Sequence, residues 1–378
     1  MSKLKDEDEA LKNQDIQKEM KNKLEEMIKD GREIGMQLCV YHQGELVVNT
    51  YAGIINTESK IPVTEQTLFP AFSTTKGFAS TLLHILVERG KLDYEQRICE
   101  IWPEFAQNGK ENILIKHALN HTAGVPHLPP NLTAADICNF EKMCEIVANQ
   151  TPISAPGERQ EYHAFTYGWI IGRLIELASK MSFTAFLEQE IKKPLGTDSI
   201  FVGVPDDVMA TWPIATVYEP GFDKSNFNTE GYETYPECCM PMCEGINQKA
   251  SLQACIPGVN GVFNALSMAR LYAALLPGSP GVTNGIKLLT PETVKKISAV
   301  SSRLVTPEWT STLGLGYFIG GYGKRETIFG HGGYGGSAAF ADPEYDFSIG
   351  FTKNYFHPNG AELEIVKTVR ELLDIPVD

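Results

Sequence analysis

Ser73 and Lys76 are the residues of this sequence whose types and spacing best suit covalent chemistry. They begin and end the string Ser73-Thr74-Thr75-Lys76, at the start of a predicted helix over 73–88. A spacing of three places both side chains on one helical face, within contact range. A lysine that is desolvated there favours its neutral form and can accept the serine proton. The helix N-terminus adds partial positive charge where negative charge develops during acyl transfer.

The four-residue string alone supports such a site only weakly. A second S-x-x-K string, Ser2 to Lys5, lies in the charged N-terminal segment, where no pocket can form. The helix over 73–88 differs because its residues between 82 and 87 are apolar nearly all round, which predicts a central, buried helix. Without further motifs, the better interpretation is Ser73 as a helix N-cap and Lys76 as a solvent-facing lysine.

Two further segments carry residues suited to the same chemistry. Tyr162-His163-Ala164 follows the Pro156-Gly157 turn, and His331-Gly332-Gly333 ends a predicted strand. With Ser73 to Lys76, these segments make the chain resemble the serine β-lactamase and penicillin-binding-protein superfamily. Its three motifs are S-x-x-K, Y-x-N or S-x-N, and K-T-G. The nearer likeness is to the class C β-lactamase-like carboxylesterases, and it covers about residues 30–375.

Shorter segments support the resemblance because they look like landmarks of the family in the family's order. They are Gly90-Lys91-Leu92-Asp93, Ala118-Leu119-Asn120-His121-Thr122-Ala123-Gly124, Pro194-Leu195-Gly196 and Gly314-Leu315-Gly316-Tyr317. An ordered set of this kind is far more specific than any single motif.

The resemblance implies roles for the first two motifs. Ser73 would be the acylated nucleophile, and Lys76 would accept its proton. Tyr162 would share the base role and pass a proton to the leaving group, since a phenolate is stabilised by the neighbouring ammonium. The interpretation without chemistry is that Tyr162 is a core tyrosine.

The resemblance also implies a substrate-binding third motif. His331, followed by Gly332 and Gly333, takes the place of the K-T-G lysine. The backbone N–H groups of Ser73 and Tyr334 would form the oxyanion hole.

Two departures from the superfamily's motifs bear on the substrate. Ala164 stands where penicillin-active relatives often carry asparagine, and it removes an amide that can contact an acylamino group. His331 replaces a permanently charged lysine, and a histidine is mostly neutral near pH 7. We therefore expect a serine hydrolase acting on esters or lactones. An acyltransferase using the same acyl-enzyme with an alcohol or amine acceptor stays open, as do β-lactamase or D,D-peptidase-like activity and an inactive scaffold.

Two other features are interpreted as structural. Gly330, Gly332 and Gly335 satisfy the dinucleotide fingerprint G-x-G-x-x-G, which requires a following helix, whereas residues from 337 onward predict a strand hairpin. The glycines are expected to let a substrate approach the strand edge. His121 is expected to hold a loop through hydrogen bonds, outside the site.

The elements that must position these residues follow from hydrophobic periodicity. The N-terminal quarter predicts a helix over 16–30 after a loose charged tail (1–15), then a hairpin over 36–41 and 45–51. The middle predicts helices over 139–149, 166–180 and 183–193. The last quarter predicts strands over 313–319, 326–329, 337–341 and 345–352 and a helix over 361–373.

Strands at both ends with helices between them imply an α+β fold, with an antiparallel sheet flanked by helices and a mostly helical insertion. We expect one β-lactamase-like catalytic domain over 16–378. Its sheet subdomain would comprise about 16–99 and 265–378, and its helical subdomain about 100–264.

Composition limits the partners and the location. The net charge of −14 argues against nucleic acid, which requires clustered positive charge. The charged first nine residues do not fit a secretory signal, and no apolar window approaches the length of a membrane span. These features predict a cytoplasmic protein. The resemblance implies a small-molecule acyl substrate. The sequence does not indicate an oligomeric state.

The cysteines do not predict a metal site. The eight cysteines are spread through the chain and are interpreted as free thiols of a reducing compartment. Cys238, Cys239 and Cys243 cluster, but they form no paired C-x-x-C motif and no histidine lies near them. We expect no metal and no cofactor.

Overall fold

The computed structural model describes residues 2–221, 237–240, 242–278, 282, 285, 287–305, 310–320, 325–357 and 360–377. The central element is an eight-stranded antiparallel sheet with the strand order β2-β1-β11-β10-β9-β8-β7-β6. Its strands are β1 Gly35–His42, β2 Glu45–Gly53, β6 Ser302–Val305, β7 Thr310–Leu313, β8 Phe318–Ile319, β9 Phe329–Gly332, β10 Ala338–Asp342 and β11 Phe347–Lys353.

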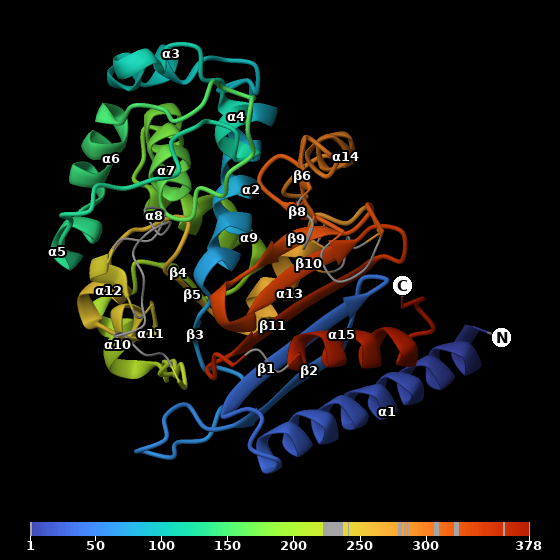
Figure 1. The fold of residues 1–378 in the computed structure, drawn as a ribbon. Coiled ribbons are helices and arrows are strands. Elements are labelled where there is room, and N and C mark those ends of the chain that lie inside the picture. Colours follow the sequence, from blue (N-terminus) through green and yellow to red (C-terminus); the bar gives the residue numbers. More distant parts are fainter. Residues whose placement is uncertain are drawn as a thin grey trace.

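The two ends of the chain complete this sheet together. Strand β1 pairs with β11 in antiparallel register, from Met36 opposite Lys353 to His42 opposite Phe347. Helices cover both faces of the sheet (Figure 1). Helices α1 (Ser2–Lys29) and α15 (Ala361–Leu372) lie together on one face, while α13 (Ala265–Ala273) packs on the other. The predicted α+β fold is confirmed.

Helix α1 extends further than the sequence predicted. Its apolar residues Ile16, Met20, Leu24 and Met27 are buried against the sheet, as their spacing required. The helix begins at Ser2, however, so residues 2–15 are helical where we expected a loose tail over 1–15. High polarity does not prevent a helix, and no glycine or proline interrupts residues 2–29.

Helices dominate the middle of the chain, between β2 and α13. They are α2 Thr75–Glu88, α3 Ile98–Ile101, α4 Ile115–Leu119, α5 Ala134–Ile137, α6 Phe140–Asn149, α7 Thr166–Ser179, α8 Phe183–Leu187, α9 Lys193–Leu195, α10 Asp206–Thr211, α11 Met242–Ile246 and α12 Lys249–Gln253. A small sheet of β3 (Phe69–Pro70), β5 (Gly261–Phe263) and β4 (Ile200–Val202) joins them. Residues 222–236 of the expected helical subdomain lie outside the described residues.

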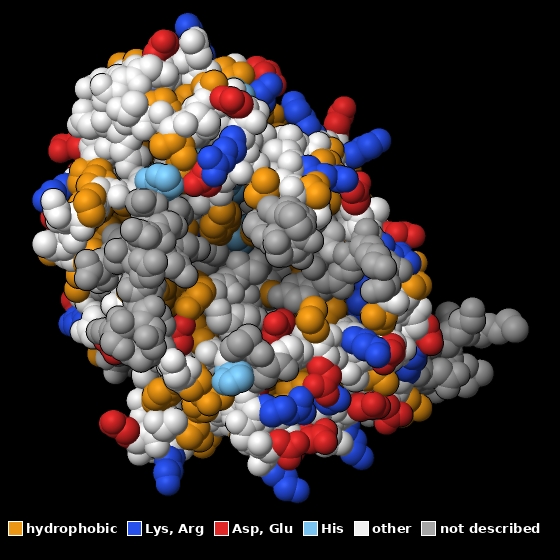
Figure 2. Space-filling model, viewed as in Figure 1, with side chains coloured by type: hydrophobic (Ala, Val, Ile, Leu, Met, Phe, Trp, Pro, Cys, Tyr) orange, Lys and Arg blue, Asp and Glu red, His pale blue; other side chains and the backbone are white. Residues whose placement is uncertain are grey.

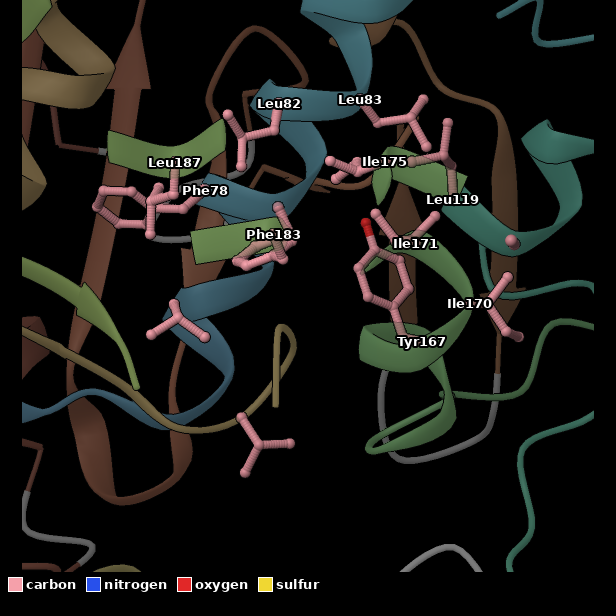
Figure 3. Close-up of a cluster of buried hydrophobic side chains, with 14 of the residues drawn as sticks. Phe78, Leu82, Leu83, Leu119, Tyr167, Ile170, Ile171, Ile175, Phe183 and Leu187 are labelled. Atoms are coloured by element: carbon pink, nitrogen blue, oxygen red, sulfur yellow. The ribbon is translucent and has the colours of Figure 1, made fainter. Parts of the chain in front are cut away.

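Helix α2 is the buried centre of this region, as its composition predicted. Every residue from Thr75 to Leu86 is buried. Phe78, Leu82 and Leu83 pack among side chains of α4, α7 and α8 (Figure 3). The helix starts two residues later than expected, because Phe72 takes a left-handed φ of +47° and a single 3₁₀ turn, η1 (Phe72–Thr74), precedes it. Ser73 therefore lies in that turn.

Two of the predicted C-terminal strands need correction. The expected strand over 313–319 is two strands, β7 and β8, separated by a turn in which Gly316 has a φ of +85°. A Cβ at Gly316 would lie 2.3 Å from the Ser80 hydroxyl oxygen, so helix α2 leaves room only for glycine there. The expected strand over 326–329 is β9, which begins at Phe329 and thus contains His331. The hairpin over 337–352 is confirmed as β10 and β11.

Surface charge is mixed on the face that Figure 2 shows. Lysine and arginine side chains are interspersed there with aspartate and glutamate (Figure 2). Two ion pairs connect the N-terminal part of the chain to α15: Lys23 of α1 and Arg32, which follows α1, both pair with Glu364. Within the described residues, no helix is both long enough and apolar enough to cross a membrane.

Candidate active site

Ser73 and Lys76 meet at the N-terminal end of α2. The Lys76 Nζ lies 3.2 Å from the Ser73 hydroxyl oxygen. Ser73 is on the 3₁₀ turn and lines a cavity, whereas the Lys76 side chain is fully buried behind it. The spacing of three residues therefore brings the hydroxyl and the amine into contact, even though the serine precedes the helix proper.

Two backbone carbonyls hold the Lys76 amine. Its Nζ donates to the oxygen of Ala164 and to the oxygen of Gly258, each at 2.8 Å. Burial lowers the pKa of Lys76 well below its usual value of 10.5. A neutral amine has two N–H groups and one lone pair. With both N–H groups directed at carbonyls, the lone pair is left for the Ser73 hydroxyl proton.

A close approach of two glycines brings the second carbonyl to the lysine. Gly168, near the start of α7, lies so near Gly258 that a Cβ on Gly168 would be 2.5 Å from the Gly258 nitrogen. A Cβ on Gly258 would lie 3.5 Å from the Lys76 Nζ. Glycine at both positions lets the 257–259 loop pass between α7 and the lysine.

Tyr162 lies over the same amine. The Lys76 Nζ is 4.9 Å from the centroid of the Tyr162 ring, and Tyr162 lines the cavity together with Ser73. The hydroxyl, the amine and the phenol, distant in sequence, thus converge at one cleft.

His121, which sequence reasoning placed outside the site, packs directly on Tyr162. The ring centroids are 4.6 Å apart. The His121 Nδ1 accepts a hydrogen bond from the His163 backbone N–H, and its carbonyl accepts one from the Glu161 N–H, so His121 holds the backbone on both sides of Tyr162. Its φ of +60° is unusual for a residue with a side chain. The signal available was the Ala118–Gly124 landmark, whose centre is this histidine.

The third motif lies on β9, across the cavity from Tyr162. The His331 ring centroid is 6.2 Å from that of Tyr162 and 4.8 Å from that of Phe318. His331 Nδ1 lies 2.6 Å from the carbonyl oxygen of Gly332. Burial, aided by the charge of Lys76, lowers the pKa of His331 to about 3. The imidazole is therefore neutral at physiological pH.

Most glycines in and around the third motif are required because a side chain would clash with neighbouring atoms. A Cβ on Gly330 would lie 2.3 Å from the Ala339 oxygen, and one on Gly333 would lie 2.2 Å from the Ala71 oxygen. A Cβ on Gly335 would meet the Phe356 ring at 2.1 Å. Only Gly332 has open space, with its nearest neighbour at 4.0 Å. Tight packing, rather than access for a substrate, explains most of the pattern, and a 3₁₀ turn and a strand follow instead of a dinucleotide-binding helix.

Tyr334 follows this strand at the rim of the cavity. Its side chain is 41% exposed and packs edge-on against Phe72, with ring centroids 5.8 Å apart. The Tyr334 hydroxyl donates a hydrogen bond to Glu219. Tyr334 thus lies beside the turn that carries Ser73, as the proposed oxyanion pair requires.

The cavity has a volume of about 750 Å³ and is lined by all the predicted site residues except Lys76, which lies beneath it. A second cavity of about 480 Å³ adjoins it and shares the side chains of Phe72, Phe165, Met242 and Val259. Cys138, Cys238 and Cys239 also line this second cavity. A mostly apolar cavity therefore adjoins the site.

The described residues contain no group of three or more histidine, cysteine or acidic side chains arranged to hold a metal ion. The Sγ atoms of Cys238 and Cys239 are 4.0 Å apart, too far for a disulfide. Residues 235 and 236, at the start of that cysteine segment, lie outside the described residues.

Comparison with known proteins agrees with this geometry. The family profile described as Beta-lactamase matches residues 20–373. The chain belongs to this family. The resemblance predicted from the motifs is therefore confirmed.

Individual relatives cover most of the chain. The esterase/beta-lactamase LipL of Mycobacterium tuberculosis is 29% identical over 337 residues, which are 85% of this chain and 77% of LipL. The structure of a penicillin-binding protein homologue from Caulobacter crescentus superposes with a TM-score of 0.83 at 28% identity, covering 94% of this chain and 98% of the homologue. A family VIII carboxylesterase superposes with a TM-score of 0.82 at 25% identity, covering 94% and 97%.

Proposed function

We propose that this member of the Beta-lactamase family is a serine hydrolase that forms an acyl-enzyme on Ser73 and acts on carboxylic esters or lactones. The observation that carries the proposal is the Lys76 amine, buried, bonded to two carbonyls and 3.2 Å from the Ser73 hydroxyl. A lysine at the surface would be solvated by water, and a serine that only caps a helix would not contact a buried amine.

The reaction begins with transfer of the Ser73 proton to the Lys76 lone pair while the Ser73 oxygen attacks the ester carbonyl carbon. The charge that develops on the carbonyl oxygen faces the backbone N–H groups of Ser73 and Tyr334 and the N-terminal end of α2. The bond to the alcohol oxygen then breaks, and the alcohol leaves with a proton passed through Tyr162. Water repeats these steps on the acyl-enzyme and releases the acid.

The surroundings favour esters over β-lactams. Ala164 offers its carbonyl to Lys76 but no side-chain amide to a substrate. His331 is neutral where the superfamily's motif has a charged lysine. The apolar cavity beyond Phe72 and Phe165 suits an aliphatic or aromatic acyl group. A carboxylesterase of the same fold supports this choice, and the name of the mycobacterial relative, esterase/beta-lactamase, includes ester hydrolysis.

A fluorophosphonate probe tests the nucleophile. The wild-type protein should be labelled stoichiometrically at Ser73, which mass spectrometry of the peptides would locate, and it should hydrolyse p-nitrophenyl butyrate. The Ser73→Ala variant should lose both properties. The matched control is Ser2→Ala, which removes the serine of the second S-x-x-K string and should behave as wild type.

The proposal fails if the folded wild-type protein takes up no probe and releases no p-nitrophenol. That result would favour the inactive scaffold. Product analysis with an added alcohol then separates hydrolysis from acyl transfer, since a transferase would convert most of the acyl group to the new ester rather than to the acid.

A further inference from the structure

His331 carries a buried ring nitrogen that has no hydrogen-bond partner among the described residues. Its side chain is 97% buried, and it lines the same cavity as Ser73 and Tyr162. The Nε2 atom is buried and makes no hydrogen bond within the structure. A buried polar atom without a partner destabilises a protein, so such atoms are normally paired or functional.

The other ring nitrogen determines what Nε2 can do. Nδ1 lies 2.6 Å from the Gly332 carbonyl oxygen, and a carbonyl oxygen can only accept. Nδ1 therefore carries the ring proton. In a neutral imidazole the second nitrogen then has only a lone pair, so Nε2 is an acceptor and not a donor. Burial of the ring opposes a second proton on it.

The rest of the cavity agrees with an uncharged donor as the partner. Its described lining contains no lysine or arginine, and the charged side chain that it does contain is Glu326, which pairs with Arg303. A substrate carboxylate beside His331 would lose its water shell and face a lone pair. A hydroxyl or an N–H group would instead satisfy Nε2.

We propose that His331 selects substrates that carry a hydroxyl or N–H group on the chain next to the scissile ester, and that this group donates a hydrogen bond to Nε2. This inference rests on the proposed ester hydrolysis. A lysine at the third-motif position would bind an anionic group of the substrate. His331 would instead accept a hydrogen bond from an uncharged donor. His331 is thereby a specificity-determining residue.

Matched esters test the inference. One arm varies the acyl chain: p-nitrophenyl pentanoate, each enantiomer of its 3-hydroxy derivative, and the 3-methoxy derivative, which keeps the oxygen but cannot donate. The second arm varies the alcohol: the 2-hydroxyethyl, 2-methoxyethyl and propyl esters of pentanoic acid. In at least one arm, the hydroxyl compound should exceed its methoxy partner in kcat/KM by about threefold to tenfold.

Variants separate the hydrogen bond from general effects on the cavity. His331→Leu removes the acceptor and should reduce the hydroxyl-to-methoxy ratio to about one, whereas His331→Gln restores an acceptor oxygen and should keep part of it. His331→Lys should shift the preference to an ester that bears a carboxylate, such as p-nitrophenyl hydrogen succinate. Circular dichroism would confirm that each variant is folded, and the ratio is internal to each variant.

A ratio near one in both arms for the wild-type protein, with plain esters still hydrolysed, would overturn this inference and leave the proposed function intact. A ratio that survives in His331→Leu would also overturn it. Absence of any ester hydrolysis would remove both.

Discussion

The contact between Gly168 and Gly258 allows a sharp test of how the lysine is held. In Gly168→Ala, the new Cβ would lie 2.5 Å from the Gly258 nitrogen, 3.1 Å from its Cα and 3.2 Å from the Pro257 carbonyl carbon. All three are backbone atoms, which cannot rotate away. Ordinary contact begins at 3.4 Å, so one backbone must move by roughly 0.9 Å. A shift of that size displaces the Gly258 carbonyl, whose oxygen accepts from the Lys76 Nζ at 2.8 Å, and so disturbs the placement of the amine.

Two effects of opposite sign act on the stability of this variant. Alanine is favoured over glycine within a helix by about 1 kcal/mol, whereas overpacking destabilises by about 1–3 kcal/mol. We therefore expect a net loss of at most about 2 kcal/mol, which leaves the protein folded. Misplacing a catalytic group by about 1 Å lowers turnover on the order of 10²-fold. The result should be a stable protein with kcat for p-nitrophenyl butyrate lowered about 100-fold.

Gly172→Ala is the matched control, one turn further along α7. Its Cβ would meet the Pro257 Cγ at 2.9 Å, which can move by a change of ring pucker, and the Phe140 ring at 3.1 Å, which can rotate. We expect near wild-type kcat. Urea unfolding and steady-state kinetics on both variants would check this. If Gly168→Ala turned over at the wild-type rate, or if Gly172→Ala lost as much activity, the loop carbonyl would not be what places the amine.

Three further changes give independent tests. Lys76→Met should abolish turnover. The stability of this variant relative to the wild-type protein should fall as pH rises towards 10.5, because the buried lysine of the wild type binds its proton more weakly in the folded chain than in the unfolded chain. Urea unfolding of both proteins at pH 7 and pH 10 measures this difference. His121→Ala should lower kcat roughly tenfold with little change in KM, since Tyr162 loses its support. His121→Asn should retain more activity, because asparagine tolerates a positive φ and keeps a hydrogen-bond acceptor. Equal losses in the two variants would argue against a positioning role. Gly333→Ala should destabilise the protein by about 1–3 kcal/mol in thermal unfolding and lower Ser73 labelling by the probe. The reason is that the new Cβ would lie 2.2 Å from the Ala71 oxygen, beside the turn that carries Ser73. An unchanged melting temperature would contradict that packing.

Much of the fold was predictable because its strongest signals are local. The periodicity of Ile16, Met20, Leu24 and Met27 predicted the buried face of α1, and the apolar composition of 73–88 predicted a buried helix. What periodicity misses is where a helix of polar residues begins and where tertiary contacts break a strand. The turn at Gly316 is set by Ser80 on a helix more than two hundred residues earlier, and no local pattern reports such a contact.

The candidate site shows the same division. Spacing sufficed to place Ser73 beside Lys76, since a 3₁₀ turn that leads into an α-helix also brings residues three apart together. The partners of the amine were not predictable, because they are main-chain carbonyls that any residue could offer. The prediction that His121 holds a loop through hydrogen bonds is confirmed. Its contact with the Tyr162 ring was not predictable, because that contact depends on how two loops pack.

The pairing of β1 with β11 has a consequence for biosynthesis. The hairpin that leaves the ribosome first has no neighbour on one edge until residues 347–353 have emerged, and the strand bearing His331 reaches its place only with them. A nascent chain can therefore hold Ser73 beside Lys76 long before it can recognise a substrate. Termination before residue 347 should therefore yield an open-edged, aggregation-prone product instead of a weakened enzyme, because β11 would be missing.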